Sequence, residues 1–270
     1  MLPKSNIHSH TTFADGRDTA EGMVRAALAL GFHTLGFSEH GHAEYDDCSM
    51  SPSQEPEYRA EIHRLKAQYA GQIHILLGYE HDWLSPMPGD DYEFMIESVH
   101  YVPAGGTLFC VDNTRHILED AIERHFGGDP YAMCKSYFRQ VCESCSSPRA
   151  DILGHIELVM KFNERRDLFD DADPRYLACA LEAANCAAES GKLVEINTGA
   201  IARGYRTRPY PGEAMLKRLC ERGARVMLSS DCHNSDYLDC GFADASALAL
   251  ACGFKTAWMY RGAQLEEYPL

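Results

Sequence analysis

Histidine and carboxylate residues recur along the chain at the ends of short apolar segments, beginning with the pair His8 and His10. Imidazole nitrogens and carboxylate oxygens are the donors that suit Zn, Mn or Fe. The residues in these positions are His8, His10, Asp15, His40, Glu80, His100, His155, Asp231 and His233. Because nine donors exceed the needs of one ion, the pattern predicts a centre that holds two or three divalent metal ions.

Each of these residues has a simpler structural explanation when it is taken alone. A single histidine at a strand end is usually a hydrogen-bonded structural residue, and an isolated aspartate in a turn is usually a helix cap. The pair His8 and His10 is also weak by itself, because alternating residues of a strand face opposite sides of the sheet. The simpler explanation would have to hold separately at six strand ends, so we favour one shared site.

Short apolar runs alternate with helical patterns, and these elements must position the polar residues. We expect strands at 4–8, 34–38, 74–80, 94–100, 151–155, 193–197, 225–229 and 255–260. We expect helices at 19–30, with Asp18 or Thr19 as N-cap, and at 174–190 and 211–222, each of these two with proline in its first turn. The repeated order predicts parallel strands with helices outside, in a barrel or an open sheet. Active sites of such folds lie at the C-terminal ends of the strands, where the polar residues fall.

Length and charge narrow the class of protein. The 270 residues fit one domain that spans 1–270, and no apolar run is long enough for a membrane helix. The start of the chain lacks the pattern of a secretion signal, so we expect a cytoplasmic protein that does not associate with membranes. The formal charge of −15 argues against binding to nucleic acid, which requires basic residues that neutralise phosphates.

Eleven cysteines in a chain without an export signal are interpreted as reduced thiols. Cys142 and Cys145 have the spacing of a metal-binding pair, but no second pair follows at the distance typical of a zinc ribbon. We therefore interpret them as ordinary helix residues.

The motifs as a set resemble the polymerase and histidinol phosphatase (PHP) superfamily, most closely its monofunctional histidinol-phosphatases. They are His8-Ser-His10-Thr with Asp15-Gly, Ser-Glu-His40, Gly-Tyr-Glu80, Ser-Val-His100, Gly-His155 and Ser-Asp231-Cys-His233. Softer features are Glu195-Ile-Asn-Thr-Gly-Ala and Arg203-Gly. The resemblance implies a distorted (β/α)7 barrel with three metal ions. The first ion would be held by His8, His10, Glu80 and Asp231, and the second by Glu80, His100 and His155. The third would be held by Asp15, His40 and His233. Position 15 departs from members that have histidine there, although aspartate is also a competent ligand.

The resemblance further implies hydrolysis of L-histidinol phosphate by a hydroxide that bridges two metal ions. Arg203 is a candidate for binding the phosphate and for catalysis, and Lys161 is a second candidate for binding. His42 is a candidate acid for the leaving group and could also contact the substrate. The irregular stretch 42–56 could act as a lid, and its Glu44, Asp46 and Asp47 are where we expect the cationic amino group of the substrate to bind.

Three other functions are compatible with parts of the pattern. A phosphoesterase of the same superfamily could act on a nucleotide or another small phosphate ester, and a metal-binding module could lack catalysis. A metal-independent triad hydrolase has little support, because the chain contains no Gly-x-Ser-x-Gly motif. Neither the native metal nor the oligomeric state follows from the sequence.

Overall fold

A nine-stranded sheet forms the centre of the computed structural model, which describes residues 2–89 and 91–270. Its strands, in spatial order, are β1 (Ser5–Asn6), β2 (Thr34–Phe37), β3 (His74–Asp82), β4 (Phe94–Ser98), β7 (Ile152–Leu153), β8 (Leu193–Asn197), β9 (Arg225–Ser229), β10 (Thr256–Arg261) and β11 (Gln264–Pro269). Neighbours from β1 to β10 are parallel, and β11 pairs antiparallel with β10. The expected α/β class with a parallel sheet is confirmed.

The sheet curls until β1 and β9 meet just beyond their C-terminal ends. Ser9 and Cys232 form a parallel bridge there, in which the His10 amide donates to the Cys232 carbonyl at 2.9 Å. The Cys232 amide in turn donates to the His8 carbonyl at 3.3 Å. This contact brings the first motif of the chain beside the last one, although more than 220 residues separate them.

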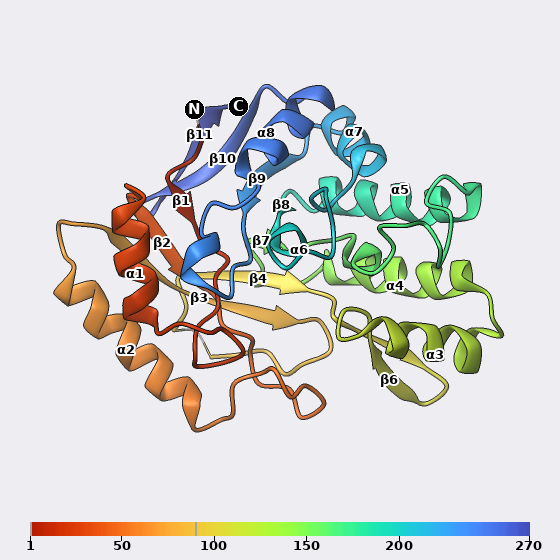
Figure 1. Ribbon diagram of the computed structural model, residues 1–270, viewed down its shortest axis with the longest axis horizontal. Coiled ribbons are helices and arrows are strands. Elements are labelled where there is room, and N and C mark those ends of the chain that lie inside the picture. The colour runs from red at the N-terminus through yellow and green to blue at the C-terminus, as the bar shows by residue number, and fades with distance from the viewer. Residues whose placement is uncertain (1, 90) are drawn as a thin grey trace.

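Helices cover the outside of the sheet (Figure 1). They are α1 (Ala20–Ala29), α2 (Gln54–Gln68), α3 (Arg115–Phe126), α4 (Pro130–Ser144), α5 (Pro174–Glu189), α6 (Gly199–Ala202), α7 (Glu213–Glu221) and α8 (Phe242–Ala251), with short 3-10 turns η1 (Leu158–Met160) and η2 (Ser235–Tyr237). A hairpin of β5 (Tyr101–Ala104) and β6 (Thr107–Cys110) precedes α3. Figure 1 shows α1 and α2 together at one side and α3, α4 and α5 stacked at the other. Among the described residues, no helix has the length and apolar character required to cross a bilayer.

Two of the three predicted helices begin and end as their capping residues indicate. The Thr19 side chain accepts a hydrogen bond from the Gly22 amide, and Gly31 follows the end of α1 with a φ of +73°. Asp173 caps α5 in the same way. The predicted start of the third helix at residue 211 is wrong: α7 begins at Glu213, because Gly212 is the N-cap and its amide donates to Glu157 instead.

Three of the predicted strands are shorter than expected at the rim that carries the histidines. β1 covers two residues, β4 ends before His100 and β7 ends before His155. At two of these ends, the backbone amide that would continue the ladder donates a hydrogen bond to a carboxylate instead. The His100 amide donates to Asp82 at 2.9 Å, and the His155 amide donates to Glu195 at 3.2 Å. The chain therefore leaves the sheet where its histidines turn toward the site.

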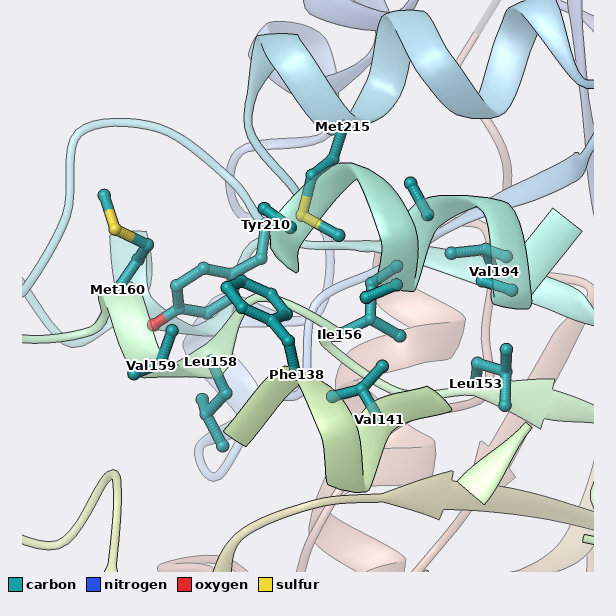
Figure 2. Close-up of a cluster of buried hydrophobic side chains, with 14 of the residues drawn as sticks. Phe138, Val141, Leu153, Ile156, Leu158, Val159, Met160, Val194, Tyr210 and Met215 are labelled. Atoms are coloured by element: carbon teal, nitrogen blue, oxygen red, sulfur yellow. The ribbon is translucent and has the colours of Figure 1, made fainter. Parts of the chain in front are cut away.

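An apolar layer behind β7 and β8 holds the segment that follows His155. Phe138 and Val141 of α4 pack toward Leu153, Ile156 and the residues after it (Figure 2). Burial of each such side chain stabilises the fold by about 1.5–3 kcal/mol. This layer fixes the position of the segment after β7, which carries His155.

Candidate metal centre

The structure brings together all nine residues that the sequence singled out as metal ligands. They form four overlapping groups, and within each group the donor atoms lie within 4.8 Å of one another. The groups are His10, Asp15, His40 and His233; His8, His155 and Asp231; His8, His10 and Glu80; and His40, Glu80 and His100. All of them lie at the C-terminal ends of the parallel strands, as predicted.

The buried carboxylate of Glu80, near the end of β3, lies at the middle of these groups. Five imidazoles face its two oxygens. Oε2 lies 3.2 Å from His8 Nε2, 3.3 Å from His10 Nε2 and 3.0 Å from His40 Nδ1, and Oε1 lies 3.4 Å from His100 Nε2 and 3.0 Å from His155 Nε2. A carboxylate with one oxygen toward each of two sets of imidazoles has the geometry of a bridging ligand.

A second carboxylate, Asp15, closes the group nearest to solvent. Its Oδ2 lies 3.1 Å from His233 Nε2, and its Oδ1 lies 3.8 Å from His40 Nε2. The His10 ring stacks against both of these imidazoles, with centroid separations of 4.3 Å. Aspartate at position 15 therefore occupies the place that the sequence pattern assigned to a ligand.

Several donor atoms in this centre are buried without a hydrogen-bond partner. They include His8 Nε2, both ring nitrogens of His10, and Glu80 Oε2. Each buried polar atom left unsatisfied costs about 1–3 kcal/mol, so native structures rarely contain several together. These ring nitrogens and the carboxylate oxygen face one another without forming hydrogen bonds. Such an arrangement of nitrogen and oxygen atoms fits the binding of divalent cations.

The electrostatics agree with this interpretation. Burial alone would raise the pKa of Glu80, but His8, His40 and His100 hold it well below its usual range. Burial would likewise lower the pKa of His40, whereas Glu80 and Asp15 raise it to about 9. The carboxylates thus favour positive charge at the centre, as a divalent cation would supply.

Glu195, which is not one of the nine residues, contacts the imidazole of His8 and the backbone amide of His155. It is fully buried on β8, and its Oε1 lies 2.7 Å from His8 Nδ1. Its Oε2 accepts the amides of His155 and of the Asn197 side chain. A carboxylate on the distal ring nitrogen fixes the tautomer and the orientation of a ligating histidine.

The variant Glu195→Gln is expected to weaken metal binding about 10–100-fold, because glutamine keeps the size of the side chain but loses the charge that orients His8. Competition with a chromogenic chelator measures this change. Excess metal should restore activity, and unchanged metal affinity would show that Glu195 does not position His8.

Asp231 reaches the centre through an unusual backbone conformation. Its φ of +44° is left-handed, which aspartate tolerates better than most residues. Its Oδ1 lies 3.4 Å from His10 Nε2, and its Oδ2 accepts a hydrogen bond from Arg203 Nη2 at 3.1 Å. A Cβ at Gly199 would approach Asp231 Oδ2 to 2.8 Å, so glycine at that position leaves room for this contact.

A cavity of about 210 Å³ opens onto the centre. Arg203 and Lys161, the two predicted phosphate-binding residues, both line it. The Lys161 ammonium donates to the Asp112 carboxylate at 3.0 Å and to its carbonyl at 2.7 Å. Asp112 could not be identified from the sequence, because no motif contains it and it meets Lys161 only in the folded chain.

The structure does not bring His42 to this cavity. Its Nδ1 lies 3.1 Å from the Met50 carbonyl, and it is absent from the described residues that line the cavity. The geometry therefore does not support His42 as the acid for the leaving group or as a substrate contact, because its ring is engaged with its own loop.

Of the three acidic residues predicted to bind the amino group, only Asp46 lines the cavity, and Glu44 and Asp47 are exposed. Asp46 accepts a hydrogen bond from the Tyr101 hydroxyl at 3.1 Å. The predicted irregular stretch 42–56 also extends too far, because α2 begins at Gln54.

Comparison with known proteins gives a consistent result. The family model described as "PHP domain" matches residues 6–199. A Deinococcus radiodurans protein named "Probable histidinol-phosphatase" is 31% identical, over 91% of this chain and 92% of its own length. The histidinol-phosphatase of Bacillus subtilis is 25% identical, over 90% of this chain and 97% of its own length. The structure of histidinol phosphate phosphatase from Lactococcus lactis, complexed with Zn, L-histidinol and phosphate, superposes with a TM-score of 0.74 at 21% identity, covering 98% of this chain and 100% of that one.

Proposed function

Because this chain belongs to the PHP domain family, we propose that it hydrolyses L-histidinol phosphate to L-histidinol and phosphate with divalent metal ions. The observation that carries the proposal is the convergence of nine donors with unpartnered buried atoms, in a chain similar to histidinol-phosphatases over nearly its whole length. We also propose that residues 1–270 form one domain with the distorted (β/α)7 barrel of the family.

We assign three ions to this centre. The first would be held by His8, His10, Glu80 and Asp231; the second by Glu80, His100 and His155; and the third by Asp15, His40 and His233. The four groups support this partition, because the three predicted sets overlap with them and Glu80 belongs to two groups. Zinc is compatible with the donors and is the metal in the Lactococcus lactis structure, while Mn and Fe accept the same donors.

Catalysis of phosphomonoester hydrolysis depends mainly on neutralising charge and holding the reactants in line. Divalent ions would supply a Lewis acid for the phosphoryl oxygens and an activated water as nucleophile. Arg203 and Lys161 lie at the cavity wall, where their cationic heads would hold the remaining phosphoryl oxygens. Asp46 would face the ammonium or imidazolium group of the leaving alcohol.

The variant Arg203→Ala is expected to raise KM about 10–100-fold while the metal content stays unchanged. A charge-assisted hydrogen bond contributes about 1.5–3 kcal/mol, and this one would be lost with the guanidinium. Steady-state kinetics combined with metal analysis checks this. Arg208→Ala is the matched control, since Arg208 is an exposed arginine of the same loop outside the cavity. Equal KM values for the two variants would remove Arg203 from phosphate binding.

A substrate panel tests the proposed function. The metal-loaded protein should hydrolyse L-histidinol phosphate with a kcat/KM at least about 100-fold above those for nucleoside monophosphates and p-nitrophenyl phosphate, because binding of the cationic leaving group adds to that of the phosphate. Comparable kcat/KM values for all the esters would indicate a general phosphoesterase and would contradict the assignment of L-histidinol phosphate as the substrate. Metal uptake without hydrolysis of any ester would indicate a non-catalytic metal-binding module.

A further inference from the structure

Two thiols from neighbouring outer helices meet on the side of the molecule that carries α4 and α5. The Cys142 and Cys186 sulfur atoms lie 2.7 Å apart, and both residues are partly exposed. This distance exceeds the ~2.0 Å length of a disulfide bond by only about 0.7 Å. Cys142 is the first cysteine of the Cys-x-x-Cys sequence that the metal centre does not use.

The neighbouring Cys145 does not turn this pair into a metal site. Its thiol donates to the Val141 carbonyl of its own helix at 3.1 Å. Among the residues that the structure describes, none of the groups with metal-binding geometry contains a cysteine. The two sulfur atoms therefore lie close together, and the pair lacks the donor set for an ion.

A surface hollow between α4 and α5 gives small molecules access to Cys142. Cys142 lines it, together with three cationic residues, Lys135, Arg139 and Arg175, and the acidic Glu182. Arg139 and Arg175 also pair with Glu143 and Asp173, and Lys135 adds a cation that favours an anionic reagent at this position.

We propose that Cys142 and Cys186 form a modification site at which an anionic low-molecular-weight disulfide, such as glutathione disulfide, oxidises the two thiols to a bond between α4 and α5. One thiolate attacks the reagent, forming a mixed disulfide and releasing one glutathione thiol. The second thiol then attacks the protein sulfur of that mixed disulfide, releasing the other glutathione. Two electrons pass from the protein to the reagent, and both protein thiol protons end on solvent or on the two glutathione molecules.

The environment sets the rate of this exchange and its consequence. Burial and the neighbouring Cys186 raise the pKa of Cys142, so the thiolate fraction is small and the exchange should become faster as the pH rises. The bond would join two residues that are 44 positions apart in the sequence, and the segment that it closes contains β7 and His155. Cross-links of this span restrict the unfolded chain, so oxidation should raise the midpoint of thermal unfolding by about 5 °C.

Incubating the metal-loaded full-length protein with glutathione disulfide, followed by alkylation and peptide mapping, tests the proposal. We expect one peptide pair linked through Cys142 and Cys186, and a rise in the unfolding midpoint that reverses with reductant. Cys186→Ser and Cys142→Ser should each abolish both effects. Cys179→Ser is the matched control, because Cys179 lies on the same helix and its thiol bonds only to backbone carbonyls in the contacts described.

Quantitative alkylation of both thiols after this treatment would overturn the proposal. A mixed disulfide with glutathione that persists on Cys142 would also overturn it, as would a link from Cys186 to Cys145. Because the readouts are a mass and a melting temperature, the result is independent of whether histidinol phosphate is the substrate.

Discussion

The variant Glu80→Gln is expected to lower kcat on L-histidinol phosphate by about a thousandfold or more and to reduce the bound metal. Glu80 places one oxygen toward His8, His10 and His40 and the other toward His100 and His155. Glutamine has nearly the same shape, but its neutral amide provides a single weak acceptor and cannot bridge two cations. Metal analysis by mass spectrometry and steady-state kinetics on the same preparation measure both effects.

Glu97→Gln is the matched control for this substitution. Glu97 is also buried, and it pairs in register with His81 on the adjacent strand β3. It lies 2.8 Å from His81 Nδ1 and belongs to none of the metal-binding groups among the described residues. The control should retain its metal and activity within a few-fold. Equal losses in both variants would mean that any buried charge change disrupts the fold, and wild-type turnover in Glu80→Gln would refute the bridging assignment.

The variant Asp231→Asn is expected to reduce kcat/KM by about 10²–10³-fold. The substitution removes a charged donor beside His10 and also releases Arg203, so it affects the metal centre and the phosphate site together. Asparagine adopts the left-handed backbone as readily as aspartate, so the loop should keep its conformation. An unfolding midpoint within about 2–4 °C of wild type would show that the loss is chemical, since such a shift corresponds to about 1 kcal/mol.

The neighbouring Asp236→Asn provides the comparison for Asp231→Asn. Asp236 is exposed on η2, a few residues further along the same loop. It should retain full activity. If Asp231→Asn instead keeps most of the wild-type kcat/KM, the first metal ion does not need the Asp231 carboxylate as its fourth ligand. Asp231 would then serve mainly to hold Arg203.

The sequence was sufficient to locate the candidate ligands, because their chemistry depends on residue type and on position at strand ends. His8 and His233 are far apart in the chain, but parallel strands place their C-terminal ends at one rim. The supporting carboxylates were not predictable in this way. Glu195 acts through a contact with His8 across 187 residues, and nothing in its local sequence reveals that partner.

Several elements between residues 54 and 145 were given no bounds from the sequence, although local signals for three of them were present. Gly105-Gly106 is a turn sequence typical of a hairpin, and it connects β5 and β6. Asp129 before Pro130 is a typical helix start, and it caps α4. α2 is harder to predict, because only Tyr58, Ile62 and Leu65 are buried in a strongly charged helix.

The strand boundaries were wrong for a different reason. A residue pattern indicates where a segment is apolar, but it does not show which backbone amide will donate a hydrogen bond to a carboxylate. At His100 and His155 the amide hydrogen bonds go to Asp82 and Glu195, so each strand stops two residues before its predicted end. These departures occur where the chain builds the site, as expected when function competes with regular structure.

Stepwise reconstitution of chelator-treated protein, with metal content and turnover of L-histidinol phosphate measured on the same preparation, tests whether hydrolysis depends on the metal centre. Phosphate release should be negligible in the metal-free protein. It should rise with added Zn, Mn or Fe and level off when three ions are bound per chain. Full turnover by metal-free protein, or no turnover with the full complement of ions bound, would contradict a metal-dependent histidinol phosphate hydrolase.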